Sequence, residues 1–349
     1  MLRDELISLI KRGEPISRLD LAGMDLRRAE LSGAIFEEVS FRDADMTGAT
    51  LKESMLVGCD LTGAKLAGAN LHHTGIVNGT LSEATLAGAY LADAKVSGTD
   101  FSFADFTGAT FVISHLVKAN LTGAKLDGAS LDRTSLIEAT VTNMSLAAAK
   151  LKQAIMMGLD LVTVNLKSAR FDNAVLIGSK LAGMDLSGKD LTLTQLMGCD
   201  LRGAEMTSAV LTQCNFKDAD LTQAKLDKAI SGRALFIGAK LLGASLRGAK
   251  LTQSLFIEAD LTGADLDGAV ADQCILTRAT CRGTRFTSAD LTYADFSHAD
   301  ITEADFTKAT LFRARFHQTK EDRAIFGSRA AALGDDRELA DAERWTPKL

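Results

Sequence analysis

The sequence has very little of what would place a protein in a membrane or on a nucleic acid. Its 349 residues include only 2 Pro, 1 Trp and 2 Tyr. No apolar run approaches the roughly 20 residues of a transmembrane helix. Asp4 and Glu5 lie near the start and no small-residue cleavage site follows, so the N-terminus does not resemble a signal peptide. With 39 basic and 45 acidic residues the net charge is −6, and no basic patch indicates nucleic-acid binding. We expect a cytoplasmic protein with no membrane insertion and no direct nucleic-acid binding.

What the sequence does contain is a five-residue repeat that never loses register. From Leu21 to Phe316 every fifth residue is large and apolar over sixty units, and only Ser231, Ala271 and Cys281 break the rule. Two places before it, 52 of the 60 units have Ala, Ser, Thr, Gly or Cys. This inward pair with one outward residue between favours extended backbone, and a helix could not keep an apolar face at period five. The repeat predicts an all-β solenoid of stacked coils.

The units also resemble a known family. AGANL (67–71), TGADL (262–266), TSADL (287–291) and TEADF (302–306) are similar to the A(D/N)Lxx consensus of pentapeptide-repeat proteins, and the resemblance covers about 300 residues. It implies a right-handed quadrilateral β-helix with four units, or 20 residues, per coil, and hence about 15 coils. A column of aromatic residues 20 apart supports the four-unit coil independently, because such residues would stack in the core. The column is Phe216, Phe236, Phe256, Leu276, Phe296 and Phe316.

The N-terminal flank is predicted to close one end of the solenoid. Residues 2–12 have the apolar spacing of a helix, and Gly13 and Pro15 follow as stop signals. We expect an N-terminal capping helix over 1–14, followed by the β-helix over 15–318.

The C-terminal flank, residues 319–349, is predicted to be a helical cap or tail. It should contain two short helices, 321–333 and 336–345, with Asp335 as the N-cap of the second. Trp345 is expected to anchor that helix.

Catalytic and ligand-binding patterns are missing from the sequence. There is no GxSxG, no P-loop and no dinucleotide fingerprint. The five histidines fall at predicted solvent-facing positions without metal-site spacing. The five cysteines fall at inward positions, and Cys214 and Cys274, the nearest pair in one column, would be roughly 14 Å apart, too far for a disulfide. We expect reduced thiols, no catalytic site, no cofactor, no metal and no small-molecule substrate.

One of the four faces differs from the others at its outward positions. Directly after the inward residue, 9 of 11 coils between residues 47 and 262 have a large apolar residue on this face, against 3 of 33 on the other three faces. A preference of flat strands for β-branched residues is one explanation. The other is that a second copy of the chain or another protein covers the face. The predicted interface residues are Met55, Val57, Val77, Val117, Ile137, Ile155, Met157, Val175, Ile177, Met197, Leu235, Ile237, Ile257 and Ile275.

A neighbouring face has an acidic column. Asp before the inward residue belongs to the family consensus, so a structural role accounts for most of it, although the column also gives the apolar face an acidic edge. Its members are Asp20, Asp60, Asp100, Asp160, Asp200, Asp220, Asp260 and Asp300.

Lys189 is unusual because it occupies an inward small position. Oversized residues occur at the same kind of position nearby, at Met144, Leu159, Val164 and Met184. A widened or bent cross-section with the lysine reaching past a corner is one interpretation. A buried functional lysine is the other.

Three classes of function follow from these patterns. A non-enzymatic scaffold or adaptor would dock a protein along the apolar face. A DNA mimic that binds DNA gyrase, as some pentapeptide-repeat proteins of the quinolone-protection type do, needs dense negative charge. Residues 61–180 instead hold 9 acidic and 10 basic residues, which disfavours mimicry. An enzyme or ligand binder would need a site that the sequence does not contain.

The two ends carry a narrower resemblance. Residues 3–31 and 335–345 are similar to the ends of bacterial pentapeptide proteins encoded with type VI secretion systems. This resemblance implies an accessory or effector-loading role, without indicating the partner or a mechanistic residue.

Overall fold

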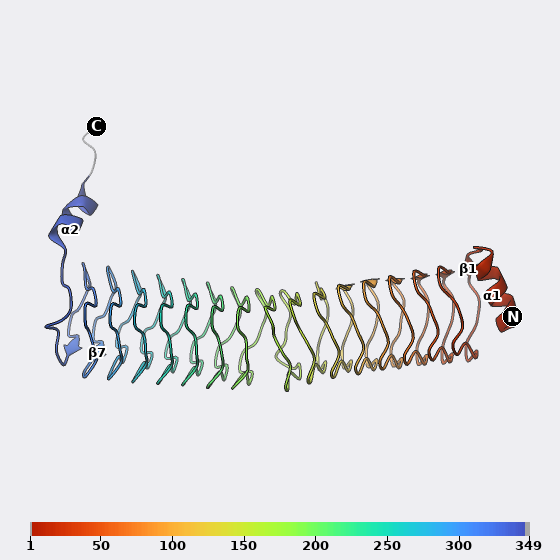
Figure 1. Cartoon of the computed structure of the whole chain (residues 1–349), viewed down its shortest axis with the longest axis horizontal. Coiled ribbons are helices and arrows are strands. Elements are labelled where there is room, and N and C mark those ends of the chain that lie inside the picture. The colour runs from red at the N-terminus through yellow and green to blue at the C-terminus, as the bar shows by residue number, and fades with distance from the viewer. Residues whose placement is uncertain (1, 346–349) are drawn as a thin grey trace. The chain divides into compact units, whose positions relative to one another are not determined.

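The computed structural model describes residues 2–345, in two compact units, Met1–Ser179 and Lys180–Leu349. We call these the first unit and the second unit and describe each on its own. Figure 1 shows that each is built from stacked coils, drawn from red to green in the first unit and from green to blue in the second. Within the described residues the α-helices are α1 (Arg3–Lys11) and α2 (Arg337–Arg344).

Each five-residue unit combines a tight turn with one extended residue. In a representative unit Leu61 and Ala64 point inward and are buried, and the Ala64 N–H donates to the Leu61 carbonyl at 3.0 Å. Gly63 lies between them with φ +68°, the left-handed conformation that a type II turn requires and that glycine adopts without a Cβ clash. Lys65 is extended and pairs with the residues 20 before and 20 after it. The turn between Leu61 and Ala64 thus lets both the large and the small residue of the unit point inward.

Hydrogen bonds between coils fix the register. The Leu61 N–H donates forward to the Thr80 carbonyl at 2.7 Å, and the Lys65 N–H donates back to the Ala44 carbonyl at 2.9 Å. Parallel pairs join residues 20 apart in four columns, so each coil has four sides. The predicted parallel β-solenoid of four pentapeptides per coil is confirmed. One pair from each column is Asp20–Ser40, Asp25–Asp45, Glu30–Thr50 and Ile35–Met55.

The first unit contains a six-stranded parallel sheet on one side. Its order follows the sequence, and each strand pairs with the next at a shift of 20 residues. This side is the one predicted to be apolar. The strands are β1 (Ile16–Ser17), β2 (Ile35–Glu37), β3 (Met55–Val57), β4 (Gly75–Val77), β5 (Lys95–Ser97) and β6 (His115–Val117).

Helix α1 closes the N-terminal end of the first unit and lies within the predicted range. The Leu2 N–H donates to Glu5 Oε2 at 2.7 Å, which caps the first turn. Leu6 is fully buried against the solenoid, and the Arg3 guanidinium donates to the Arg27 carbonyl at 2.8 Å.

Aromatic columns fill the core of the second unit. Phe236 stacks between Phe216 and Phe256 with ring centroids 4.9 and 4.7 Å apart and planes 3° from parallel. Phe296 stacks on Phe316 at 5.1 Å. These distances match the spacing of neighbouring strands, as a column of residues 20 apart requires.

The C-terminal flank differs from its prediction. Residues 321–333, expected to form a helix, continue the solenoid: β8 (Ile325–Phe326) pairs in parallel with β7 (Asp305–Phe306), and Phe326 stacks on Phe306 at 4.9 Å. Phe326 still occupies the inward register, so its burial against the preceding coil outweighs the local helical spacing. The solenoid makes about 16 turns, close to the expected 15, and the C-terminal flank adds to it.

Helix α2 forms inside the second predicted helix, with two differences. Its N-cap is Asp336 rather than Asp335, since the Asp336 carboxylate accepts the Leu339 N–H at 3.0 Å. The Asp335 carboxylate instead accepts the Gln318 N–H at 2.7 Å. Trp345 was expected to anchor the helix but is 72% exposed.

The oversized residues at small positions are accommodated inside the coils. Met144, Leu159, Val164 and Met184 are all buried. Lys189 is half-buried at its inward position. A bent or widened cross-section at this place stays a prediction.

Candidate interaction surfaces

We call the apolar face the surface formed by the residues directly before and after the inward residues at 36, 56, 76 and every twentieth position onward. Every predicted interface residue on it is exposed or half-buried, and none is buried. In the first unit the most exposed are Met157 at 43%, Met55 at 42% and Ile137 at 41%. The members in this unit are Met55, Val57, Val77, Val117, Ile137, Ile155, Met157, Val175 and Ile177. Their role at an interface stays a prediction.

The second unit has a more compact part of the same face. Leu235 and Ile275 precede inward residues, and Ile237 and Ile257 follow them, so two apolar rows flank the stacked phenylalanines of the core. Met197 lies further toward the start of this unit and is separated from them by the coil of Lys217.

The sequence prediction missed two residues of the apolar face. Ile35 precedes the inward Phe36, is 42% exposed and pairs with Met55. Leu255 pairs with both Leu235 and Ile275 and completes a row of three apolar residues. The available signal was the apolar residue before the inward one, which the prediction used in five other coils but not in these two.

Backbone conformation explains the apolar residues in only one part of the face. Val57, Val77 and Val117 lie in strands β3, β4 and β6, where β-branched residues are favoured. The equivalent Ile137 and Ile257 lie in turns instead. Beyond Val117, strand preference therefore does not account for the apolar residues that directly follow the inward position.

The acidic column has a structural role. The Asp260 carboxylate accepts the backbone N–H of Thr262 at 3.0 Å and its hydroxyl at 2.6 Å, and Asp60 and Thr62 repeat these contacts. Ion pairs neutralise several members further, as between Asp60 and Arg42 at 3.1 Å. Desolvation raises the pKa of the Asp60 carboxyl, but hydrogen bonds donated by Thr62 and Arg42 outweigh it and lower the pKa. These carboxylates stabilise the turns of their own chain.

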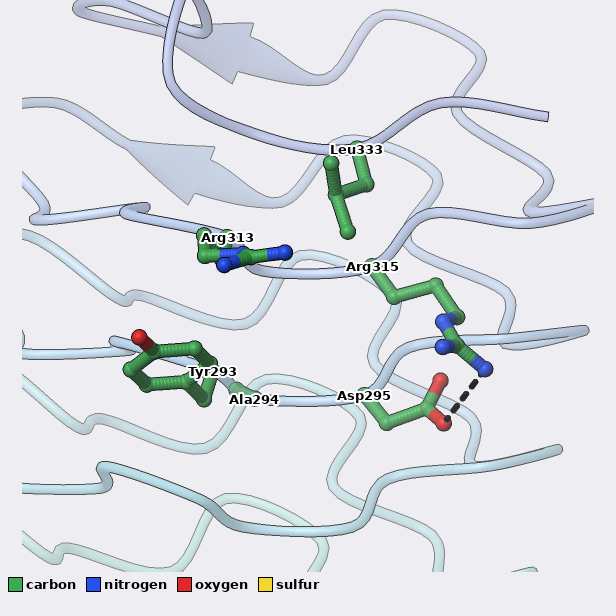
Figure 2. A pocket seen from close by; sticks show the side chains of 6 residues that line it. All are labelled: Tyr293, Ala294, Asp295, Arg313, Arg315 and Leu333. Atoms are coloured by element: carbon green, nitrogen blue, oxygen red, sulfur yellow. Dashed lines mark ion pairs between the residues drawn. The ribbon is translucent and has the colours of Figure 1, made fainter. Parts of the chain in front are cut away.

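Figure 2 shows a pocket on the second unit. It lies where the row of Leu235, Leu255 and Ile275 ends, since its lining residue Asp295 pairs with Ile275. The same row of pairs continues from Ile275 to Asp295, then to Arg315 and finally to Leu333. The pocket has a volume of about 420 Å³. Its lining residues are Tyr293, Ala294, Asp295, Arg313, Arg315 and Leu333.

The pocket presents cationic groups that are only weakly paired. Arg315 lies 3.9 Å from an Asp295 oxygen, beyond hydrogen-bond distance, while Asp295 accepts the N–H and hydroxyl of Ser297 at 2.9 and 2.6 Å. Arg313 lies over the Tyr293 ring at 5.9 Å, and among the described residues no carboxylate lies within 4.0 Å of its guanidinium. Tyr293 has φ +59°, a conformation that bulky residues rarely adopt.

Two histidines expected to be scattered on the solvated surface come together in the second unit. His298 and His317 are 19 residues apart, almost one coil, and their ring centroids are 5.5 Å apart. His317 is fully buried, because α2 folds over it. The prediction of a solvent-facing His317 is therefore wrong, since sequence spacing did not reveal the covering helix.

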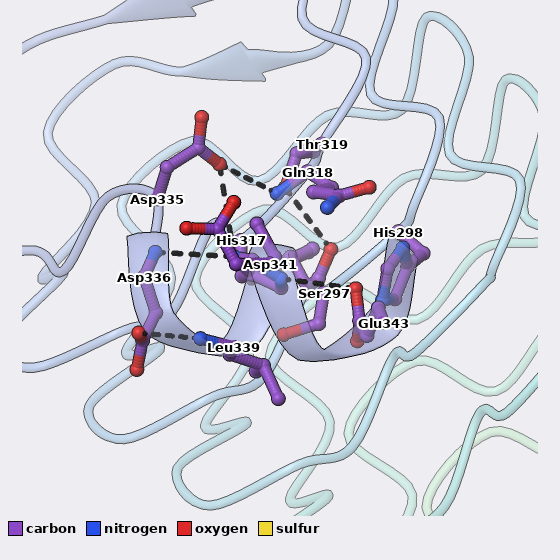
Figure 3. A network of polar contacts seen from close by, with 12 residues as sticks. Ser297, His298, His317, Gln318, Thr319, Asp335, Asp336, Leu339, Asp341 and Glu343 are labelled. Atoms are coloured by element: carbon purple, nitrogen blue, oxygen red, sulfur yellow. Dashed lines mark hydrogen bonds and ion pairs between the residues drawn. The ribbon is translucent and has the colours of Figure 1, made fainter. Parts of the chain in front are cut away.

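Glu343 of α2 completes this cluster (Figure 3). Its two carboxylate oxygens lie 3.1 Å from His298 Nε2 and 3.3 Å from His317 Nε2.

Two imidazoles and a carboxylate are also ligands for zinc. However, His317 Nδ1 accepts the Asp336 N–H at 3.1 Å, so the ring proton is on Nε2 and is donated to Glu343. A metal on Nε2 would need that proton on Nδ1. The cluster therefore fits a set of hydrogen bonds that hold α2 better than a metal site.

The five cysteines are buried, and no disulfide joins them. Burial raises the pKa of the Cys214 and Cys274 thiols to about 12, and both donate to backbone carbonyls, at 2.8 and 3.0 Å. Buried thiols of this kind behave as small apolar residues.

The part of the chain that the structure describes contains no helix long and apolar enough to cross a membrane. No curated protein matches the sequence. The model for the family "Pentapeptide repeats" matches it in eight copies. The copies cover residues 17–52, 44–74, 80–112, 114–153, 174–213, 214–253, 254–292 and 281–318.

Several similar solved structures are pentapeptide-repeat proteins. QnrB1, a plasmid-mediated fluoroquinolone resistance protein, is 22% identical over 53% of this chain and 92% of its own, with a TM-score of 0.36. HetL, involved in heterocyst differentiation regulation in the cyanobacterium Nostoc sp. strain PCC 7120, is 24% identical over 90% of this chain and 96% of its own, with a TM-score of 0.23. A thylakoid-lumen protein of Arabidopsis thaliana is 28% identical over 36% of this chain and 67% of its own, with a TM-score of 0.22. With its family model matched from residue 17 to residue 318 and its four-sided coils, the chain belongs to the pentapeptide-repeat family.

Proposed function

We propose that this protein is a non-enzymatic scaffold or adaptor that binds another protein along its apolar face. The observation that carries the proposal is the set of apolar residues at turn positions, exemplified by Ile137, Ile237 and Ile257. Turn residues at a solvent-facing corner are normally polar, because an apolar side chain there gains nothing from the fold. Contact with a partner would bury these side chains and explain why they are retained.

Paired charge-introducing variants test the proposal in the native host. Ile237→Glu with Ile257→Glu places two charges on the face, and Leu242→Glu is the matched control. Leu242 is 38% exposed at the equivalent position of an ordinary face. We expect a specific protein that co-purifies with the wild type to be lost with the double variant and kept with the control. Rebinding of that protein in purified form should follow the same pattern.

The first unit has an equivalent test for self-association. Ile137→Glu with Ile177→Glu is compared with Val162→Glu, whose residue is 46% exposed on another face. Light scattering reports whether a second copy is the partner, and a dye for apolar surface reports whether the face is open. An unchanged monomer that binds no dye, together with no partner lost in the host, would remove the basis of the proposal.

A DNA mimic directed at gyrase is the second candidate, and the described contacts disfavour it. The carboxylates of the acidic column accept hydrogen bonds within turns and form ion pairs, as Asp60 does with Arg42. The first unit has 21 acidic and 17 basic residues and the second has 24 and 22, so neither has the charge density of a duplex. Potent inhibition in a gyrase supercoiling assay would reverse this ranking.

For the setting of this activity, we propose the bacterial cytoplasm and an accessory or effector-loading role beside a type VI secretion system. Five buried cysteines without a disulfide are compatible with a reducing compartment. The secretion role rests on the two terminal sequences alone. Genes neighbouring that of this chain provide the test, and their lack of any secretion component would count against the role.

A further inference from the structure

We propose that the second unit's part of the apolar face binds an amphipathic α-helix of a partner protein, with the C-terminal end of that helix directed toward Arg313 and Arg315. This inference rests on the proposed scaffold function and specifies the kind of partner. The receiving surface consists of Leu235, Leu255 and Ile275 in one row and Ile237 and Ile257 in the other.

The chain itself provides the precedent for a helix on this face. Helix α2 lies over Ser297 and His317 (Figure 3). These residues occupy the same row as Ile237 and Ile257 and lie two and three coils beyond Ile257. Ser297 is 7% exposed and His317 is 0% exposed, whereas the isoleucines of this row are half-buried. The face therefore accepts a helix at one end, and the apolar residues adjoin the part that α2 covers.

The spacing of the apolar rows fits a helix better than a strand. Leu235, Leu255 and Ile275 lie on successive coils, about 4.8 Å apart along the stack. A helix lying along the stack presents one turn about every 5.4 Å. A strand in the same direction presents side chains on one side about every 6.6 Å. Three successive coils can therefore contact about three successive turns of a helix, or roughly 11 residues, because the spacing of coils and the spacing of helical turns are close.

The pocket at the end of the row sets the direction of the helix. Arg315 reaches back toward Ile275 as far as Asp295, and Arg313 lies beside it (Figure 2). Asp295 accepts hydrogen bonds from Ser297. The two arginines and this one carboxylate have a net charge of +1, so the pocket is positive overall. The C-terminal end of a helix is partially negative and favours cations, and acidic residues in its last turn would add to this attraction.

A second copy's α2 is a weaker occupant. Its eight residues, Arg337–Arg344, have the sequence RELADAER, with one large apolar side chain, Leu339, and five charged residues. Such a helix cannot cover two apolar rows. The fitting partner is instead a helix with Leu, Ile or Met at three- and four-residue spacing.

Designed peptides test the helix directly on the full chain. The first is a capped amphipathic peptide of about 15 residues with one leucine face, Lys in the first turn and Glu in the last. The second exchanges Lys and Glu between the ends, and the third has two central prolines that break the helix. Isoleucine methyl spectra of the protein report where each peptide binds. We expect the first peptide to shift Ile237, Ile257 and Ile275, and the proline peptide to shift none.

Variants of the chain separate the two parts of the inference. Ile257→Glu should weaken the first peptide at least about tenfold, and Leu242→Glu should leave its affinity unchanged. Arg315→Glu should remove or reverse the difference between the first and second peptides. Comparing that difference between wild type and variant cancels the intrinsic helicity of the two peptides.

Equal binding of the proline peptide, or binding of the helical peptides elsewhere or not at all, would overturn the helix. A difference between the first and second peptides that Arg315→Glu leaves unchanged would overturn its orientation. Association of the chain with itself that is lost on removing α2 would assign the face to a second copy instead. If the helix fails while a host partner is still lost with Ile237→Glu and Ile257→Glu, the scaffold function stands and only this inference falls.

Discussion

The Met55 side chain lies directly over Gly75 of the next coil. A Cβ on Gly75 would lie 2.6 Å from Met55 Sδ and 2.9 Å from its Cε. The two residues are register partners on the apolar face. The missing side chain in one coil is thus filled by a long flexible one from the coil before.

Gly75→Ala should therefore change the stability of the protein little. The thioether can swing outward, and the alanine restricts the unfolded chain, so we expect a change in unfolding free energy within about 1 kcal/mol of zero. Gly123→Ala is the contrasting variant: Gly123 has φ +66° beneath the rigid Phe103 ring, 2.6 Å from the new Cβ. It should destabilise the chain by about 1 kcal/mol or more. Denaturant unfolding measures both, and a larger loss for Gly75→Ala would contradict this account of the face.

Much of the fold could be predicted because the inward register constrains every unit in the same way. Leu61 and Ala64 must both be buried, and only the turn with Gly63 at φ +68° allows this, so the five-residue period carries the backbone with it. The period does not distinguish one side of the coil from another. It therefore could not indicate that Val57 is in a strand while Ile137 is in a turn.

The repeat could not predict the contacts between the solenoid and its flanks. His317 occupies an outward position by register, and it is buried only because α2 folds back across it. Residues 321–333 have helical spacing locally, yet the stacking of Phe326 on Phe306 extends the solenoid there. In each case a contact distant in sequence decides the outcome.

Acidification should release α2 from the second unit. Desolvation raises the pKa of Glu343, but hydrogen bonds from His298 and His317 outweigh it, and the pKa lies below its usual value of 4.5. A carboxylate with a lowered pKa stabilises the docked state above about pH 4.5, and this contribution is lost as the pH falls through the pKa of the docked state. Hydrogen exchange of Arg337–Arg344 between pH 6 and pH 3 measures the release.

Glu343→Gln provides the control for the carboxylate. It cannot titrate, so its helix should exchange faster at pH 6 and should lose this acid-dependent step. Asp335 faces His317 Nδ1 at 3.8 Å, and Asp335→Asn separates its contribution. An α2 that stays protected at pH 3 in the wild type would show that the contact with Glu343 does not hold the helix.

Ser231 should be a weak point in the core of the second unit. It occupies a large inward position, is fully buried, and its Oγ has no hydrogen-bond partner among the described residues. Ser231→Ala removes this unsatisfied hydroxyl and should stabilise the unit by about 1 kcal/mol. Ser254→Ala should have the opposite sign, because the Ser254 hydroxyl donates to the Ser231 carbonyl at 2.5 Å. Unfolding midpoints in denaturant measure both, and equal signs would contradict the assignment.

The C-terminal coil is covered in part by a cation rather than by an apolar helix. Arg329 lies 4.8 Å from the Phe316 ring centroid and 5.0 Å from that of Phe326, and it also pairs with Glu321. A guanidinium over two ring faces contributes roughly 1 kcal/mol or more per contact when partly desolvated.

Arg329→Ala should therefore expose Phe326, raise dye binding and speed hydrogen exchange of β8. Arg329→Lys should recover only part of the protection, because an ammonium cannot stack on the rings. Glu321→Gln keeps the stacking and removes the ion pair. If it proves as damaging as Arg329→Ala, the carboxylate rather than the rings positions the arginine over the end of the solenoid.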